Sequence, residues 1–208
     1  MLYDITRTIS NTTHVWPGDT PYSVTQTLSK SAGDAVNLLT LTLSAHTGTH
    51  ADATYHYADA GDHPATMPLA AYIGPARVVH VALRDGPLLP QHLSHIDLTG
   101  GERLLIRSHV SDLPDDQWPQ TIPYLSVDLI EHLAGLNYKL IGLDSPSVDA
   151  FDSKDLPCHH ALRRYGLVNL EHLLLRGVPE GDYELVALPL KLDAACGSPV
   201  RAILRTLS

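Results

Sequence analysis

Short segments with strand-like patterns are spread along the whole chain. Leucine alternates with threonine and serine in residues 39–44, which predicts a strand with one buried face. Short apolar runs bounded by glycine, proline or aspartate predict more deeply buried strands at residues 77–83, 103–107, 139–143 and 183–190. The alternation in residues 199–207 predicts one more strand near the end of the chain.

Helical spacing of apolar residues is clear in two segments. Residues 126–135 can begin at a capping Ser126 and end at Gly135, and residues 155–165 can end at Gly166. Because 44% of the 208 residues are hydrophobic, the chain can bury one sizeable core, and its length does not require a second domain. These patterns predict a single α/β domain over residues 1–208, rich in strands and with long connecting loops.

The charge balance narrows the class of partner. The 14 basic residues against 23 acidic ones leave a net charge of −9, which disfavours nucleic acids and anionic membranes and favours a small molecule. No apolar run follows a basic leader, and no segment approaches the roughly 20 apolar residues of a membrane span, so we expect a cytoplasmic protein. Cys158 and Cys196 are too few for a disulfide framework, and both are expected to be reduced.

Histidines cluster between residues 46 and 63. From His46 to His56 every second residue is His, Gly, Asp or Thr, so in an extended chain these side chains face one side. A helix is the competing interpretation, but the Thr-Gly-Thr between His46 and His50 forms helix poorly. Residues four apart on a straight strand are separated by about 13 Å, so the chain must bend for both rings to bind one ion. Gly48 is the residue that allows this bend.

The residue types of this segment suit a metal ion. Two imidazoles and a carboxylate, from His46, His50 and Asp52, favour Zn²⁺, with Mn²⁺ or Fe²⁺ as alternatives. Three protein ligands leave a position open for water, which indicates catalysis. The alternative is a histidine-rich polar loop that arose by chance and only completes strand ends. His56, between two tyrosines, favours a site.

A second group of candidate ligands lies in the second predicted helix and after it. Cys158, His159 and His160 precede Glu171 by an interval that fits one helical segment and a turn, so they could complete a two-metal centre. A solvated helix face is the competing interpretation. Cys158 could be a soft metal ligand, but a buried, inert thiol is the favoured interpretation.

Other candidates for chemistry are weaker. Ser44, Ser145 and Ser147 do not lie in a Gly-x-Ser-x-Gly elbow, which disfavours a serine hydrolase. Trp16 is followed by Pro-Gly, and a tryptophan before such a turn either packs in the core or presents its ring at a pocket rim.

With these motifs in place, the chain resembles a known family. Residues 46–56 (His-Thr-Gly-Thr-His-x-Asp-x-x-x-His) resemble the signature of the metal-dependent cyclase-like hydrolases, and within them the chain is most similar to the bacterial kynurenine formamidases, or arylformamidases. The resemblance covers nearly the full length. It is also carried by residues 15–19, 139–147, 188–191 and 198–202.

The resemblance implies a role for each candidate ligand. His46, His50 and Asp52 would hold one metal ion, and Asp52 would bridge to a second ion. His159 and Glu171 would hold that second ion. The expected cofactor is Zn²⁺, two ions per subunit, with Mn²⁺ or another divalent ion as the alternative.

The remaining roles also follow from the resemblance. His56 would be the proton donor and acceptor, and Trp16 would line the substrate pocket. His159 is preferred to His160 because its interval to Glu171 is the one expected from the family. The chain departs from the family pattern where Thr54 replaces a proline, which loosens the loop that aims His56.

The chain departs from the family pattern at a second position. His172 stands where the family has glycine, so it either perturbs the second metal site or points away.

The implied reaction is the hydrolysis of N-formyl-L-kynurenine to L-kynurenine and formate in tryptophan degradation, by a metal-activated water with His56 moving the proton. The alternatives are a related hydrolase acting on another amide or on a ring such as isatin, and a non-catalytic metal-binding protein. A swivelling β/β/α fold of mixed sheets with flanking helices and a homodimer are implied as well.

Overall fold

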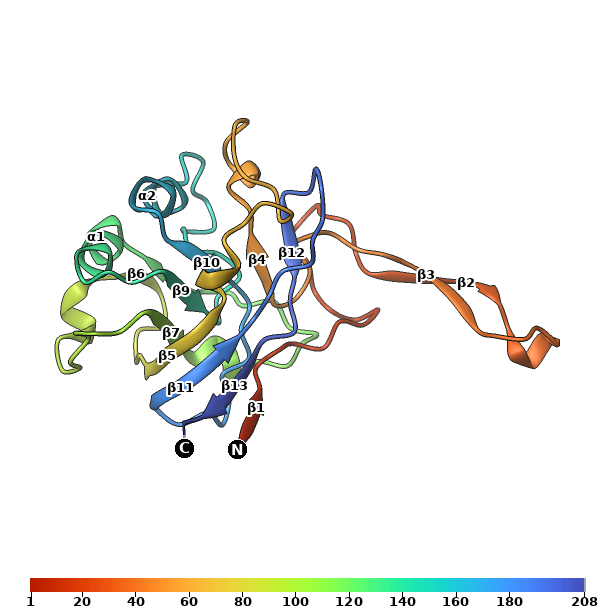
Figure 1. The fold of residues 1–208 in the computed structure, drawn as a ribbon, viewed down its shortest axis with the longest axis horizontal. Coiled ribbons are helices and arrows are strands. Elements are labelled where there is room, and N and C mark those ends of the chain that lie inside the picture. The colour runs from red at the N-terminus through yellow and green to blue at the C-terminus, as the bar shows by residue number, and fades with distance from the viewer. Residues whose placement is uncertain (208) are drawn as a thin grey trace.

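The computed structural model describes residues 1–207, and its centre is a seven-stranded mixed sheet (Figure 1). The strands lie in the order β1 (Leu2–Asp4), β13 (Ile203–Thr206), β11 (Gly181–Val186), β5 (Ile73–His80), β7 (Arg103–Arg107), β9 (Leu140–Leu143) and β10 (Val168–Leu170). Pairing is antiparallel from β1 to β5 and parallel from β5 to β10. Every predicted strand except that of residues 39–44 lies in this sheet.

Two helices, α1 (Val127–Gly135) and α2 (Pro157–Tyr165), correspond to the two predicted ones. The side chain of Ser126 caps α1 by accepting a hydrogen bond from the backbone N–H of Leu129, as expected. α2 ends at Gly166, whose φ of 72° is left-handed. The end of α1 differs from the prediction, because Gly135 is still helical and the left-handed residue is Asn137.

The sheet is covered on both faces, which gives three layers. On one face, Leu104 and Ile106 of β7 belong to the same buried cluster as Leu129 of α1. Between them in sequence, Leu105 points to the opposite face and shares a cluster with Ala51. Ala51 belongs to β4 (His50–Asp52), which pairs antiparallel with β12 (Gly197–Pro199). The predicted β/β/α arrangement is therefore confirmed, with the β4–β12 pair as the second β layer.

The remaining elements are short. β6 (Gly86–Leu88) and β8 (Pro123–Leu125) form a parallel pair. Single turns of 3₁₀ helix occur at Lys30–Ala32, Thr54–His56, Leu69–Ala71, Pro90–Leu93 and His109–Asp112. In the described part of the chain, no helix has both the length and the apolar character needed to cross a membrane.

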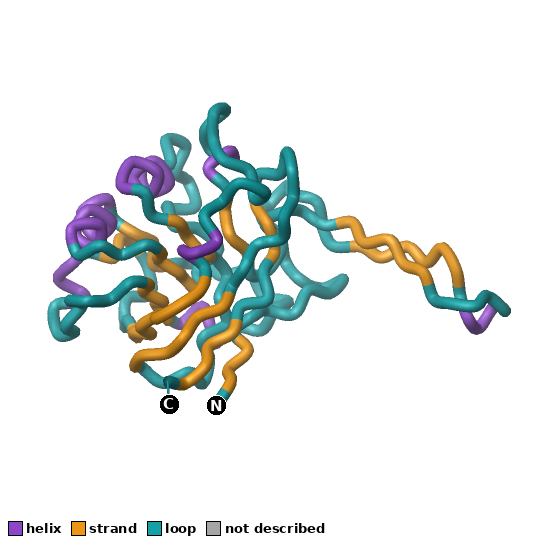
Figure 2. The backbone as a smooth tube through the Cα atoms, viewed as in Figure 1, coloured by secondary structure: helices purple, strands orange, loops and turns teal. Residues whose placement is uncertain are grey.

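A hairpin of β2 (Ser23–Leu28) and β3 (Leu38–Thr42) projects from the body of the molecule (Figures 1 and 2). We call this hairpin, residues 23–42, the arm. The predicted strand is present, but the predicted buried face is wrong, because every residue of both strands is exposed. Val24, Leu39 and Leu41 keep 41%, 50% and 57% of their surface exposed. No element of residues 1–207 covers this apolar face.

Candidate active site

The segment from His46 to His56 follows the arm and turns twice. Residues 45–49 form a turn and a bend, β4 runs from His50 to Asp52, and Thr54–His56 is a 3₁₀ turn. The even spacing predicted a common face on an extended chain, and that explanation is wrong beyond β4. The side chains converge because the chain bends on both sides of a three-residue strand.

Gly48 makes the first bend, as predicted. Its φ of 65° is left-handed, and a Cβ at this position would lie 3.1 Å from Cγ1 of Ile9. The carbonyl oxygen of Gly48 also lies 2.8 Å from Nδ1 of His50. The glycine therefore turns the chain and positions the histidine that follows it.

The first predicted ligand group is assembled around one carboxylate oxygen. Nδ1 of His46 lies 2.9 Å from Oδ1 of Asp52, and Nε2 of His50 lies 3.3 Å from the same atom. His50 and Asp52 are buried, at 1% and 5% exposure. The structure thus brings His46, His50 and Asp52 together.

The second predicted group meets the other oxygen of Asp52. Nε2 of His159, from α2, lies 3.4 Å from Oδ2 of Asp52 and 3.8 Å from Oε1 of Glu171. Glu171 follows β10 and is held beside β4 by two backbone hydrogen bonds with His50. His159 is buried whereas His160 is exposed, so the structure places His159 and not its neighbour at this position.

Each of these three histidines has a second partner for its outer ring nitrogen. An N–H on the outer nitrogen leaves the lone pair on the inner nitrogen, which faces the carboxylates. The pairs are Nδ1 of His50 with the carbonyl oxygen of Gly48 at 2.8 Å, Nδ1 of His159 with Oδ2 of Asp149 at 2.7 Å, and Nε2 of His46 with Sγ of Cys196 at 3.2 Å.

The inner atoms fit a divalent cation. Nε2 of His50 and Oδ1 of Asp52 are both buried and form no hydrogen bond, although they lie 3.3 Å apart. Lone pairs from imidazoles and carboxylates that point at one another repel unless a proton or a cation lies between them. His46, His50 and Asp52, and separately Asp52, His159 and Glu171, place one ligand atom each within 4.8 Å of the others. Imidazole and carboxylate are the donors that zinc and manganese accept.

The electrostatics of His50, His159 and Asp52 agree with this interpretation. Burial disfavours a positive charge on His50, but the adjacent carboxylates of Asp52 and Glu171 outweigh burial and raise its pKa to about 10. In the same way, Asp149 and Asp52 raise the pKa of His159 to about 10. Burial also opposes the charge of Asp52, yet the three histidines hold its pKa well below the usual range. The carboxylates that favour a positive charge on these rings would favour a bound cation in place of the protons.

Asn169 fixes both carboxylates. Its Nδ2 donates to Oδ2 of Asp52 at 2.7 Å and to Oε1 of Glu171 at 3.2 Å. The backbone N–H of Val148 donates to the same Oε1 at 3.0 Å. Because these donors occupy one oxygen of Glu171, its Oε2 is left facing Nε2 of His50 at 3.4 Å.

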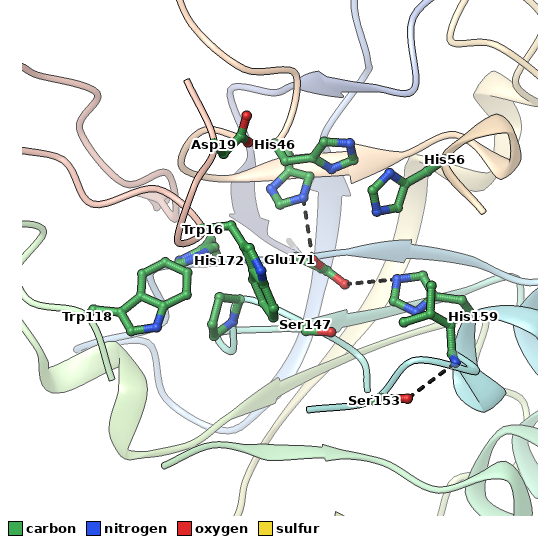
Figure 3. A pocket seen from close by; sticks show the side chains of 13 residues that line it. Trp16, Asp19, His46, His56, Trp118, Ser147, Ser153, His159, Glu171 and His172 are labelled. Carbon is green, nitrogen blue, oxygen red and sulfur yellow. Dashed lines mark hydrogen bonds and ion pairs between the residues drawn. The ribbon is translucent and has the colours of Figure 1, made fainter. Parts of the chain in front are cut away.

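A pocket of about 340 Å³ opens above these groups (Figure 3). Its floor is formed by His46, His50, His159 and Glu171, and its wall by Trp16 and Trp118. The two tryptophan rings meet edge to face with centroids 5.8 Å apart, and Phe151 packs 5.6 Å from Trp16. Trp16 therefore lies at the predicted pocket.

His56 also lines the pocket, beside the first ligand group. It is exposed, and its ring centroid lies 4.1 Å from that of His46. At the position where the family has proline, Oγ1 of Thr54 accepts a hydrogen bond of 2.6 Å from the backbone N–H of Asp62. This bond ties down the loop that carries His56.

The backbone and the ring of His172 have defined positions relative to the two ligand groups. Its backbone is left-handed, with φ 55°, as a glycine at this position would allow. Its ring lines the pocket 5.6 Å from that of Trp118 and lies outside both ligand groups. Burial lowers the pKa of the His172 ring well below the usual range of histidine.

Several residues of the site are not predicted from the sequence. Asp149, Asn169 and Cys196 act through contacts between segments far apart in the chain, and no local pattern marks them. Trp118 had a usable signal, because it and Trp16 are the only two tryptophans of the sequence and both precede proline. Cys158 is buried as expected, and its thiol donates to the carbonyl oxygen of Leu125.

Similar proteins carry related descriptions. Residues 3–150 match the family model described as putative cyclase. A kynurenine formamidase from Salinibacter ruber is 45% identical over 205 residues, which cover 98% of this chain and 97% of that protein. A solved structure described as a potential metal-dependent hydrolase with cyclase activity is 25% identical, with a TM-score of 0.84 and coverage of 98% and 96%. Isatin hydrolase A from Labrenzia aggregata shares the fold, with a TM-score of 0.84 at 23% identity and coverage of 100% and 94%.

Proposed function

This chain belongs to the putative cyclase family, together with the bacterial kynurenine formamidases, and on that premise we propose that it hydrolyses N-formyl-L-kynurenine to L-kynurenine and formate. The observation that carries the proposal is the set of inward-facing imidazole lone pairs and carboxylate oxygens at the floor of an aromatic pocket. Residues 1–208 act as one amide hydrolase domain. Its place is in tryptophan degradation, and the expected cytoplasmic location stays a prediction.

The metal ligands are the two groups that share Asp52. His46, His50 and Asp52 hold one ion, and Asp52, His159 and Glu171 hold a second, with Zn²⁺ as the ion at both positions and Mn²⁺ as the alternative. The distances among the ligand atoms and the outer partner of each histidine support this assignment. When bound, the ions polarise the formyl oxygen and make water nucleophilic near neutral pH.

The protein's own groups move the proton. His56 is an imidazole at the pocket wall, and imidazole can accept and donate protons near neutral pH. It takes the proton from the attacking water and delivers it to the aniline nitrogen as the amide bond breaks. Delivery of that proton to the aniline nitrogen returns His56 to its starting state, and the exposed ring stays open to solvent.

The pocket wall selects an aryl substrate. Trp16 and Trp118 present aromatic rings that can pack on the aniline ring of the substrate. Asp19 lines the same pocket, and its carboxylate is a suitable partner for the α-ammonium group of N-formyl-L-kynurenine. Isatin has no such ammonium group, which is the observation that favours the formamidase over an isatin hydrolase.

The arm supports the expected homodimer. An isolated two-stranded hairpin is only marginally stable in water, and the face that carries Val24, Leu39 and Leu41 is apolar and exposed. A second copy of the chain covers this face in our proposal. The arm leads directly into the turn that carries His46, so the proposed dimer contact and the candidate active site are adjacent in the sequence.

A substrate panel tests the function. We expect purified protein loaded with Zn²⁺ to release kynurenine from N-formyl-L-kynurenine much faster than it opens isatin or cleaves formanilide. D19N should raise the KM for N-formyl-L-kynurenine and leave formanilide unaffected. Preference for isatin would favour the related hydrolase instead, and metal binding without turnover of any of the three compounds would favour a non-catalytic protein.

A further inference from the structure

Of the three outer partners of the ligand histidines, Cys196 differs in chemistry from the others. His50 faces a backbone carbonyl and His159 faces the carboxylate of Asp149, both strong acceptors at 2.8 and 2.7 Å. His46 faces a sulfur atom at 3.2 Å, which is a weak acceptor. The orientation of His46 therefore depends on a cysteine side chain that could be replaced without altering the backbone.

We propose that Cys196 is a positioning residue: its sulfur accepts the Nε2–H of His46 and so holds the Nδ1 lone pair of that ring toward Asp52. This inference rests on the proposed function, since it assumes that His46 holds a metal ion. Ligand histidines in metal sites commonly donate their other N–H to an acceptor that fixes the ring and its tautomer. In this site the sulfur of Cys196 is the acceptor for the outer N–H of His46.

The backbone places Cys196 with little freedom. Its carbonyl oxygen accepts a hydrogen bond of 3.0 Å from the N–H of Ala53, and the next residue, Gly197, pairs with Asp52 in the β4–β12 layer. The register of two strands thus sets the distance between Cys196 and the ligand group.

Gly197 shows how closely the ring of His46 is held. A Cβ at Gly197 would lie 3.0 Å from Cε1 of His46 and 3.1 Å from the carbonyl oxygen of Ala51. The imidazole therefore lies directly against the backbone of β12, with the sulfur of Cys196 at its outer nitrogen. With the backbone of β12 against the ring and the sulfur at its edge, the thiol decides which nitrogen faces Asp52.

The same sulfur lies next to the proton-transfer residue. His46, His56 and Cys196 each place one ligand atom within 4.8 Å of the others. Cys196 can therefore orient His56 as well as His46. The competing role is that Cys196 itself binds a metal ion together with the two histidines, and the two roles differ in whether sulfur contacts the metal.

Two variants test the positioning role. C196A removes the acceptor, and we expect it to weaken divalent-ion affinity about 10-fold or more, the usual effect of losing such a partner. C196S keeps an acceptor at the same place and should recover most of that affinity. The measurement is competition for Zn²⁺ against a chromogenic chelator, with circular dichroism and the Tm of each ion-free variant as checks on folding. On the loaded enzymes, C196A should lower kcat more than it raises KM.

The outcomes separate this inference from the proposed function. Equal ion affinity of folded C196A and wild type, or a C196S as weak as C196A, would overturn the positioning role. A sulfur-to-metal charge-transfer band in the Co²⁺-loaded wild type would also overturn it, because Cys196 would then be a ligand. A wild type that binds the ion but hydrolyses no formamide would contradict the proposed function alone, and the affinity comparison would still decide the role of Cys196. A wild type that binds no divalent ion would overturn both.

Discussion

The β4–β12 layer and the arm are both short antiparallel strand pairs, but the first buries polar side chains and the second exposes apolar ones. In β4 the polar residues His50 and Asp52 are buried, at 1% and 5% exposure. In the arm the apolar residues Leu39 and Leu41 are exposed, at 50% and 57%. Burial of polar groups costs free energy unless each has a partner, and exposed apolar patches gain by being covered. The first region therefore suits a bound ligand, and we propose that the second is covered by a second copy of the chain.

The largest effect is expected where the two ligand groups meet. D52N removes the charge shared by both groups and presents an amide N–H₂ to imidazole nitrogens, so we expect ion affinity to fall by more than about 100-fold, beyond the usual loss of an outer partner. Activity should fall below detection. Elemental analysis after gel filtration and a kynurenine assay measure both. D59N, an exposed loop aspartate, is the control and should match wild type; an active D52N would contradict the shared-ligand assignment.

The next largest effect is expected at His56, where a loss of turnover can be distinguished from a loss of metal binding. H56A should lower kcat by about 10²–10⁴-fold, the usual contribution of a general acid–base group, and keep its bound ion. H160A is the matched control, because that histidine is exposed on α2 and should be dispensable. Undiminished release of kynurenine by H56A would remove His56 from its role.

A pair of glycines compares the two regions directly. Gly48 beside the site and Gly33 at the tip of the arm both have left-handed backbones, with φ of 65° and 98°. Alanine at either position should destabilise the fold by about 1–2 kcal/mol, measured by urea unfolding. G48A should also weaken ion binding, because its Cβ would crowd Ile9, whereas a Cβ at Gly33 meets no atom within 4 Å. Equal ion affinities for G48A and G33A would show that the bend does not position His50.

The smallest effect on turnover is expected in the arm. L39S combined with L41S makes the apolar face of the arm polar. Burial of each leucine in the dimer contact would stabilise it by about 1.5–3 kcal/mol, so the double variant should change from dimer to monomer. Its kcat should change little. T40S combined with T42S alters the opposite face and is the control. Light scattering after size exclusion measures the mass. A monomeric wild type, or equal dissociation of both variants, would contradict the proposed role of the arm.

Local patterns in the sequence predict much of the central sheet and both helices, because those elements are long enough to show a period. They predict an extended path through β4 without its bounds, and they fail for β10 and β12, which have three residues each and exist through tertiary contacts. They also fail for the burial of the arm, because alternation predicts a strand with an apolar face and does not say what covers that face.

The site divides in the same way. His46, His50 and Asp52 are predictable because they lie close together in the sequence and share one chemistry. His159 and Glu171 needed the family resemblance, since competing interpretations of that segment stayed open. Asp149, Asn169 and Cys196 reach the site only through the packing of α2, β10 and β12 around β4, which no local pattern reports.

Removal and return of the metal ion tests the central claim most directly. Protein treated with a chelator, separated from it and shown by elemental analysis to be free of divalent ions should lose its N-formyl-L-kynurenine hydrolysis. Re-addition of Zn²⁺ or Mn²⁺ should restore kynurenine release in proportion to the ion bound per chain. Full activity in protein proven free of metal would contradict the account.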